Sequence, residues 1–208
     1  MQNRRLENSV RNLIALYTMV IAVALSLAVK TLIDIDRGLE SVGMSSALLF
    51  IAFVLTLVPF YHGALRHLDD AYIENANQHI KPGALIIDVL LLLLHAIAFV
   101  VLSLLLNKPS HFVWILLVAL AIDVLWGLFA HFGSSSSNGL AAESKWTIIN
   151  FIFVGGVTWY LVDRDIYLSY AGDPTKLSVL IVIACAIRTL VDYVWCRAFY
   201  FPKQEMTT

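Results

Sequence analysis

The stretch 84-ALIIDVLLLLLHAIAFVVLSLLL-106 is an almost unbroken apolar run that contains one aspartate and one histidine. A helix needs about 20 residues to cross a hydrocarbon layer of about 30 Å, and this run is long enough. Backbone N–H and C=O groups in lipid must bond within their own segment. The run therefore predicts a transmembrane helix with two titratable side chains inside the membrane.

Several runs of this kind indicate a membrane protein rather than a soluble one. Hydrophobic residues make up 60% of the 208 residues and charged residues only 14%, with a mean hydropathy of +0.80. Soluble domains are about half apolar and a quarter charged. No segment shows the alternation of a membrane strand. We predict an all-α, polytopic protein, a single membrane domain over 1–208, with about six transmembrane helices at 13–33, 45–65, 84–106, 112–132, 146–162 and 177–200.

The distribution of Lys and Arg predicts how the chain is oriented. Cytoplasmic flanks of membrane helices carry an excess of these residues. With the N-terminus inside, eight fall on the cytoplasmic side and five on the other, which places both termini in the cytoplasm. We expect a multi-pass protein of the cell membrane, plasma or inner. The net charge of −1 provides no basic field for nucleic acid. The eight Lys and Arg residues expected on the cytoplasmic side are Arg4, Arg5, Arg11, Arg66, Lys81, Lys145, Arg197 and Lys203.

The last apolar run places two full charges inside the hydrocarbon layer, in 185-CAIRTLVDYVWC-196. Arg188 and Asp192 are four residues apart, so they share a helix face and can form an ion pair. Asp123, in the fourth run, is expected at a similar depth because both runs cross in the same direction. Each central charge costs about 3 kcal/mol on insertion scales. We expect all three to face the bundle interior, as a structural staple between helices or as a functional site.

Three more polar residues are candidates for the same site. Asp88 and His95 are seven residues apart on one face of the run 84–106, and Asp88 can alternatively lie at the membrane interface. His95 is near mid-depth, where it is either a packed neutral histidine with one hydrogen bond or a proton carrier. His62 follows Pro59, which removes one hydrogen bond from its helix and favours a bend.

Other aromatic and polar residues have more ordinary interpretations. The fifth run carries a mild polar stripe along one side. Tryptophan and tyrosine near the ends of spans are typical anchors at membrane surfaces. The stripe consists of Thr147, Asn150 and Thr158, and the expected anchors are Trp126, Trp146, Trp159 and Trp195 with Tyr160, Tyr200 and Phe201.

The segment 66-RHLDDAYIENANQHIKP-82 is the longest polar stretch of the chain. Its composition favours a helix that continues beyond the membrane and ends near Pro82, because proline cannot continue a helix. On the cytoplasmic side, such a link is either solvated or a surface for a protein partner.

The buried aspartates, arginine and histidine indicate a class of function without naming a substrate. Carboxylates attract a cation or carry a proton, an arginine tunes them, and histidine titrates near neutrality. A proton or cation channel or a small transporter is the leading hypothesis, and a homo-oligomer is expected because six short helices enclose a pathway with difficulty.

Two alternatives remain open. One is a non-catalytic membrane effector or scaffold that binds a partner through residues 66–82. The other is a membrane-embedded enzyme that acts on lipid or uses a metal or haem, with His62 and His131 as a candidate pair for haem. No sequence motif predicts a cofactor or metal site.

Overall fold

The computed structural model describes residues 2–33, 42–74, 82–133, 142–163 and 173–201. Within these ranges every regular element is a helix, which confirms the all-α prediction. In chain order the helices are α1 (Gln2–Leu32), α2 (Met44–Asp69), the π-helical turn η2 (Asp70–Glu74), α3 (Pro82–Leu104), α4 (Pro109–Gly133), α5 (Ala142–Val162), α7 (Pro174–Trp195) and α8 (Arg197–Tyr200).

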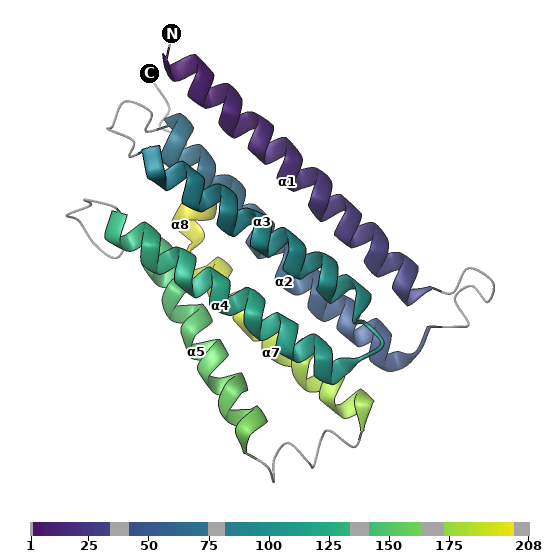
Figure 1. The fold of residues 1–208 in the computed structure, drawn as a ribbon. Helices are drawn as coiled ribbons and strands as arrows, with labels where there is room; N and C mark the ends of the chain where they lie inside the picture. Colours follow the sequence, from purple (N-terminus) through teal and green to yellow (C-terminus); the bar gives the residue numbers. More distant parts are fainter. Residues whose placement is uncertain (1, 34–41, 75–81, 134–141, 164–172, 202–208) are drawn as a thin grey trace.

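The long helices lie side by side in one bundle (Figure 1). α1 packs chiefly on α3, α2 packs on α7, and α4 packs on both α3 and α5. Phe53, Phe99 and Phe112 are the largest fully buried side chains of the interior. The start of α1, the end of α2 and α8 lie toward one end of the bundle, which we name the α8 end (Figure 1).

Five of the described helices are long and apolar enough to cross a membrane. Their outward sides are apolar as well: on α3, Ile86, Leu90, Leu93 and Ile97 are each more than half exposed. These residues recur at steps of three and four, which is one face of a helix. An exposed apolar face of this kind fits a lipid surrounding. The spans are Leu6–Leu32, Met44–Ile73, Gly83–Leu104, Pro109–Phe129 and Pro174–Trp195.

The predicted span 146–162 forms α5, which packs along α4 and also contacts α7 (Figure 1). It is not among the five apolar helices found in the described part of the chain. Lys145 and Asn150 stand in its first half and shorten its apolar length. The sixth crossing and the cytoplasmic position of the termini therefore stay predictions.

Helix boundaries differ from prediction where helices continue past their apolar parts or stop early. α1 is helical from Gln2, ahead of the expected start at residue 13. The first part of the polar link 66–82 is the end of α2 followed by η2. Its residues His67, Leu68 and Tyr72 are buried against the bundle. Residues 75–81 of the link lie outside the described residues. The last span ends at Trp195 rather than 200, because Cys196 leaves helical geometry with φ −96° and ψ 15°.

Pro59 shows how α2 and α7 are fixed to one another. Proline has no N–H, so the carbonyl of Leu55, four residues earlier, loses its helical partner. Thr189 of α7 donates its hydroxyl to that carbonyl at 2.7 Å. Near the start of both helices, the hydroxyls of Ser45 and Ser178 hydrogen bond at 2.7 Å. These contacts fix the register that brings Arg188, the neighbour of Thr189, against α2.

Candidate functional site

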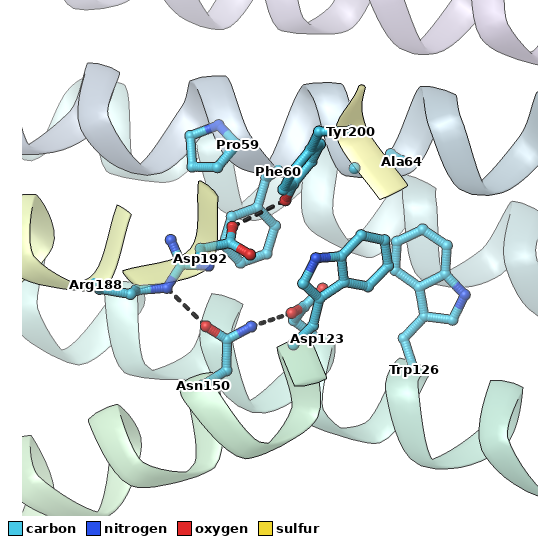
Figure 2. A pocket seen from close by; sticks show the side chains of 11 residues that line it. Pro59, Phe60, Ala64, Asp123, Trp126, Asn150, Arg188, Asp192 and Tyr200 are labelled. Atoms are coloured by element: carbon cyan, nitrogen blue, oxygen red, sulfur yellow. Dashed lines mark hydrogen bonds between the residues drawn. The ribbon is translucent and has the colours of Figure 1, made fainter. Parts of the chain in front are cut away.

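Five polar side chains from four helices surround a small cavity inside the bundle (Figure 2). They are Asp123 of α4, Asn150 of α5, Arg188 and Asp192 of α7, and Tyr200 of α8, and we name them the Asp123 site. The cavity has a volume of about 20 Å³. One water molecule needs about 10–15 Å³ by the same measure, so the cavity has room for a single water.

Arg188 does not pair with Asp192, and the predicted ion pair is wrong. Both side chains are buried, with 5% and 3% of their surface exposed. The Nε–H of Arg188 instead donates to the amide oxygen of Asn150 at 2.6 Å. Its guanidinium lies over the ring of Phe60, 4.8 Å from the centroid. Nη1 of this guanidinium has no hydrogen-bond partner among the residues that the structure describes.

Asn150 joins α5 to two other helices, a role that its place in a mild polar stripe did not reveal. Its amide oxygen accepts from Arg188, and its amide N–H donates to Oδ2 of Asp123 (Figure 2). The side chain is 1% exposed. A lone amide in the middle of an apolar run was the signal that could have found it, since buried amides must find partners.

Asp192 is held from the α8 end of the bundle. The hydroxyl of Tyr200 donates to its Oδ2 at 2.9 Å, and Oδ1 has no hydrogen-bond partner in the part of the chain that the structure describes. Tyr200 lies beyond the last span, and burial together with the negative charge of Asp192 raises the pKa of its phenol. The phenol therefore stays protonated and acts as a donor. This corrects the expectation that Tyr200 is a surface anchor.

Gly63 of α2 has no side chain, so the wall of the cavity approaches this helix closely. A Cβ at this position would stand 3.1 Å from the Trp146 ring and 3.5 Å from the hydroxyl of Tyr200. Trp146 is held on its other side by Phe199, whose ring is perpendicular to it at 4.8 Å between centroids. The absence of a side chain at Gly63 thus allows Trp146 and Tyr200 to meet α2.

His95 lies beside the Asp123 site with 1% of its surface exposed. Its Nδ1 is 3.0 Å from the carbonyl of Leu91, so this nitrogen carries the proton in the neutral ring. Its Nε2 is 4.0 Å from Oδ1 of Asp123 and makes no hydrogen bond. The ring packs 5.2 Å from that of Phe60. This geometry fits both sequence interpretations, the packed neutral histidine and the proton carrier.

Asp88 belongs to a second cluster and is buried inside the bundle, while its depth in the membrane stays a prediction. We name His67, Tyr72, Asp88 and Trp126 the Asp88 cluster. Tyr72 donates to Oδ2 of Asp88 at 2.5 Å, and Trp126 donates to Oδ1 at 2.7 Å. His67 Nε2 lies 3.4 Å from Oδ2. The cluster ties the end of α2 and η2 to α3 and α4.

His62 lies next to the Asp123 site rather than in it. Its Nδ1 is 3.4 Å from the hydroxyl of Tyr193, and its ring is 4.8 Å from that of Tyr200. The side chain is half-buried. The second half of the proposed haem pair, the side chain of His131, lies outside the described residues.

The tryptophans divide into two groups that the sequence did not separate. Trp126 and Trp146 are buried inside the bundle, so their assignment as surface anchors is wrong. Trp159 is 68% exposed and Trp195 is 42% exposed. Trp126 and Trp195 each follow an aspartate by three residues, yet only Trp126 points into the bundle. Spacing alone does not tell the two groups apart, because the packing of each helix decides which face is inside.

Comparison with family models, with curated proteins and with solved structures finds nothing similar to this chain. Among the residues that the structure describes, no three His, Cys, Asp or Glu side chains converge as a metal site would require. We therefore infer the function of this protein from the geometry of the Asp123 site.

Proposed function

We propose that this integral membrane protein binds a proton or a small cation at the Asp123 site and carries it across the membrane. The observation that supports the proposal is an imbalance of charge. Asp123 and Asp192 face one buried cation, Arg188, around the same cavity. With all three ionised the site has one negative charge in excess. Because an uncompensated buried charge costs several kcal/mol, the site favours uptake of a positive charge.

The size of the cavity favours a carrier over an open channel. A volume of about 20 Å³ accommodates one water or one small ion and is far too small for a continuous pore. A carrier exposes its site to one side of the membrane at a time, and a small site buried between helices is consistent with such a protein.

We also propose the arrangement in which this carrier works. α5 is the sixth crossing, both termini are cytoplasmic, and the α8 end faces the cytoplasm. The carrier forms a homo-oligomer in the cell membrane, because few short helices surround each site.

A second candidate function for the same residues is purely structural. Asn150 links Asp123 of α4 to Arg188 of α7, so the site also staples three helices together. Such a staple supports the fold and moves nothing. The two candidates differ in what happens when a carboxylate loses its charge.

Transport in liposomes tests the proposal. Asp123→Asn and Asp192→Asn retain the size of each side chain and remove its charge, so we expect each to reduce proton or cation flux at least tenfold while the protein stays folded. Asp69→Asn changes a half-buried aspartate that is not among the residues lining the cavity, so it is the matched control and should transport like the parent. If both site variants transport like the parent, the carrier proposal is wrong. If both lose their helical fold instead, the staple is supported.

A further inference from the structure

The ligands around the cavity distinguish between a metal cation and a proton. Ca²⁺ takes six to eight oxygen ligands and Mg²⁺ takes six in an octahedron. At the Asp123 site the amide oxygen of Asn150 already accepts from Arg188, and Oδ2 of Asp192 accepts from Tyr200. The guanidinium of Arg188, a fixed positive charge, forms part of the same wall. Few oxygens and a resident cation disfavour a metal ion.

Among the described residues, three side chains that line the cavity have a buried polar atom without a hydrogen-bond partner: Nε1 of Trp146, Nη1 of Arg188 and Oδ1 of Asp192. The last two complement one another. Nη1 of Arg188 is a donor, and Oδ1 of Asp192 is an acceptor. Both residues line the cavity, and more than nine-tenths of each is buried. One water can accept from the arginine and donate to the carboxylate, and the cavity has room for one.

We infer that the ion handled at the Asp123 site is a proton, taken up on Oδ1 of Asp192 through a single water in the cavity. The inference rests on the proposed function, since it names the ion of the same site. In the uptake step an acid on the α8 side gives its proton to the cavity water. The water passes a proton to the carboxylate, which becomes a neutral carboxylic acid. The water is regenerated and the conjugate base of the acid remains outside.

Tyr200 is the positioning residue for this step. Its hydroxyl holds Oδ2 of Asp192, which leaves Oδ1 directed at the cavity (Figure 2). The rings of Tyr193 and half-buried His62 pack on Tyr200 with centroid distances of 4.7 and 4.8 Å, on the side of Asp192 that faces the α8 end (Figure 1). The titratable and charged groups around Asp192 are Arg188 and Tyr193 of α7, His62 of α2, Asp123 of α4, Tyr200 of α8 and Cys196 at the α7–α8 junction, with Lys145 of α5 close by on the carbonyl of Trp195.

Infrared difference spectroscopy of the full-length protein in liposomes tests the inference without measuring transport. Acidification should produce the C=O band of a carboxylic acid. We expect Asp192→Asn to lose this band and Asp123→Asn to keep it. Tyr200→Phe keeps Asp192 but removes one hydrogen bond, so the band should remain and move to higher frequency. That shift is specific to positioning, because a merely structural role for Tyr200 would leave the frequency unchanged.

The outcomes separate this inference from the proposed function. If the band disappears in Asp123→Asn, or persists in Asp192→Asn, the proton is not on Asp192 and the inference is overturned. It is also overturned if Na⁺ or K⁺ at constant pH abolishes the band, or if flux assays show transport of these ions without protons, and in that last case the carrier proposal still stands. A band that behaves as expected in a protein without flux supports the inference and contradicts the carrier.

Discussion

Asp88 and Asp192 are both buried aspartates, yet the fold surrounds their carboxylates in different ways. Both oxygens of Asp88 accept strong hydrogen bonds, from Trp126 at 2.7 Å and from Tyr72 at 2.5 Å. Among the described residues, Oδ2 of Asp192 accepts from the hydroxyl of Tyr200 and Oδ1 has no hydrogen-bond partner. Asp88 also has His67 within 3.4 Å. The Asp88 cluster is saturated, and the Asp123 site is not.

This difference in hydrogen bonding distinguishes a cluster that stabilises the fold from a site that can bind a ligand. A buried polar network in which every group is satisfied makes a fold rigid, whereas an unsatisfied group costs free energy. An unsatisfied buried group in a native structure is explained by strain, by a catalytic role or by a bound water or ion. The saturated cluster therefore fits a structural staple, and the unsaturated site fits a place that exchanges a ligand.

Removal of Asp88 should have the largest effect on stability. Asp88→Ala leaves the donors of Tyr72 and Trp126 buried without an acceptor, and we expect a loss of about 2–3 kcal/mol in the free energy of unfolding. Asp192→Asn should lose less than about 1 kcal/mol, because its carboxylate is only half satisfied. Equilibrium unfolding in mixed micelles, followed by circular dichroism, compares the two. Equal losses would remove the distinction between the cluster and the site.

One hydrogen bond of the Asp88 cluster can be tested alone. Trp126→Phe retains a buried aromatic ring and removes the N–H that bonds Asp88, so we expect a loss of about 1 kcal/mol. Trp195→Phe is the matched control, since that tryptophan is partly exposed, and its stability should not change. The same unfolding assay provides the comparison. If Trp195→Phe loses more unfolding free energy than Trp126→Phe, hydrogen bonding in the Asp88 cluster contributes little to stability.

The helices were predictable because apolar length is a local property of the sequence. The runs around residues 84–106 and 112–132 each became a helix close to the expected bounds. The end of α7 was missed, because the break at Cys196 has neither proline nor glycine to signal it. The helix α5 was predicted, but its polar residues keep it out of the five helices that are apolar enough to cross a membrane, so its crossing stays a prediction.

The members of the candidate site were only partly predictable, since partners on other helices are not visible in a sequence. Asp123, Arg188 and Asp192 were expected to face inward, and they line one cavity. Their bonding was not predictable: helical spacing favoured a pair between Arg188 and Asp192, but Asn150 of α5 binds the arginine instead. The periodicity of a single helix gives the face of a residue, and the packing of several helices decides its contacts.

Gly63 allows the Asp123 site to be disturbed without touching the Asp88 cluster. In Gly63→Ala the new Cβ would press on Trp146, which Phe199 prevents from moving away freely. Overpacking costs about 1–3 kcal/mol, but alanine in place of glycine regains about 0.5–1 kcal/mol in a helix. The small net change in stability should be accompanied by a clear loss of flux, because Trp146 and Tyr200 form the wall of the cavity.

Gly155→Ala is the control for that change. Nothing lies within 4 Å of a Cβ built at Gly155, so the alanine should only strengthen α5 and leave flux unchanged. Unfolding and liposome flux measured on both variants separate packing at the cavity from helix propensity. If Gly63→Ala transports like the parent, the cavity wall tolerates displacement, and the close approach at Gly63 serves packing alone. If only Gly63→Ala loses flux, transport depends on the exact shape of the cavity at the Asp123 site. There, a shift of a few tenths of an ångström changes the room for one water.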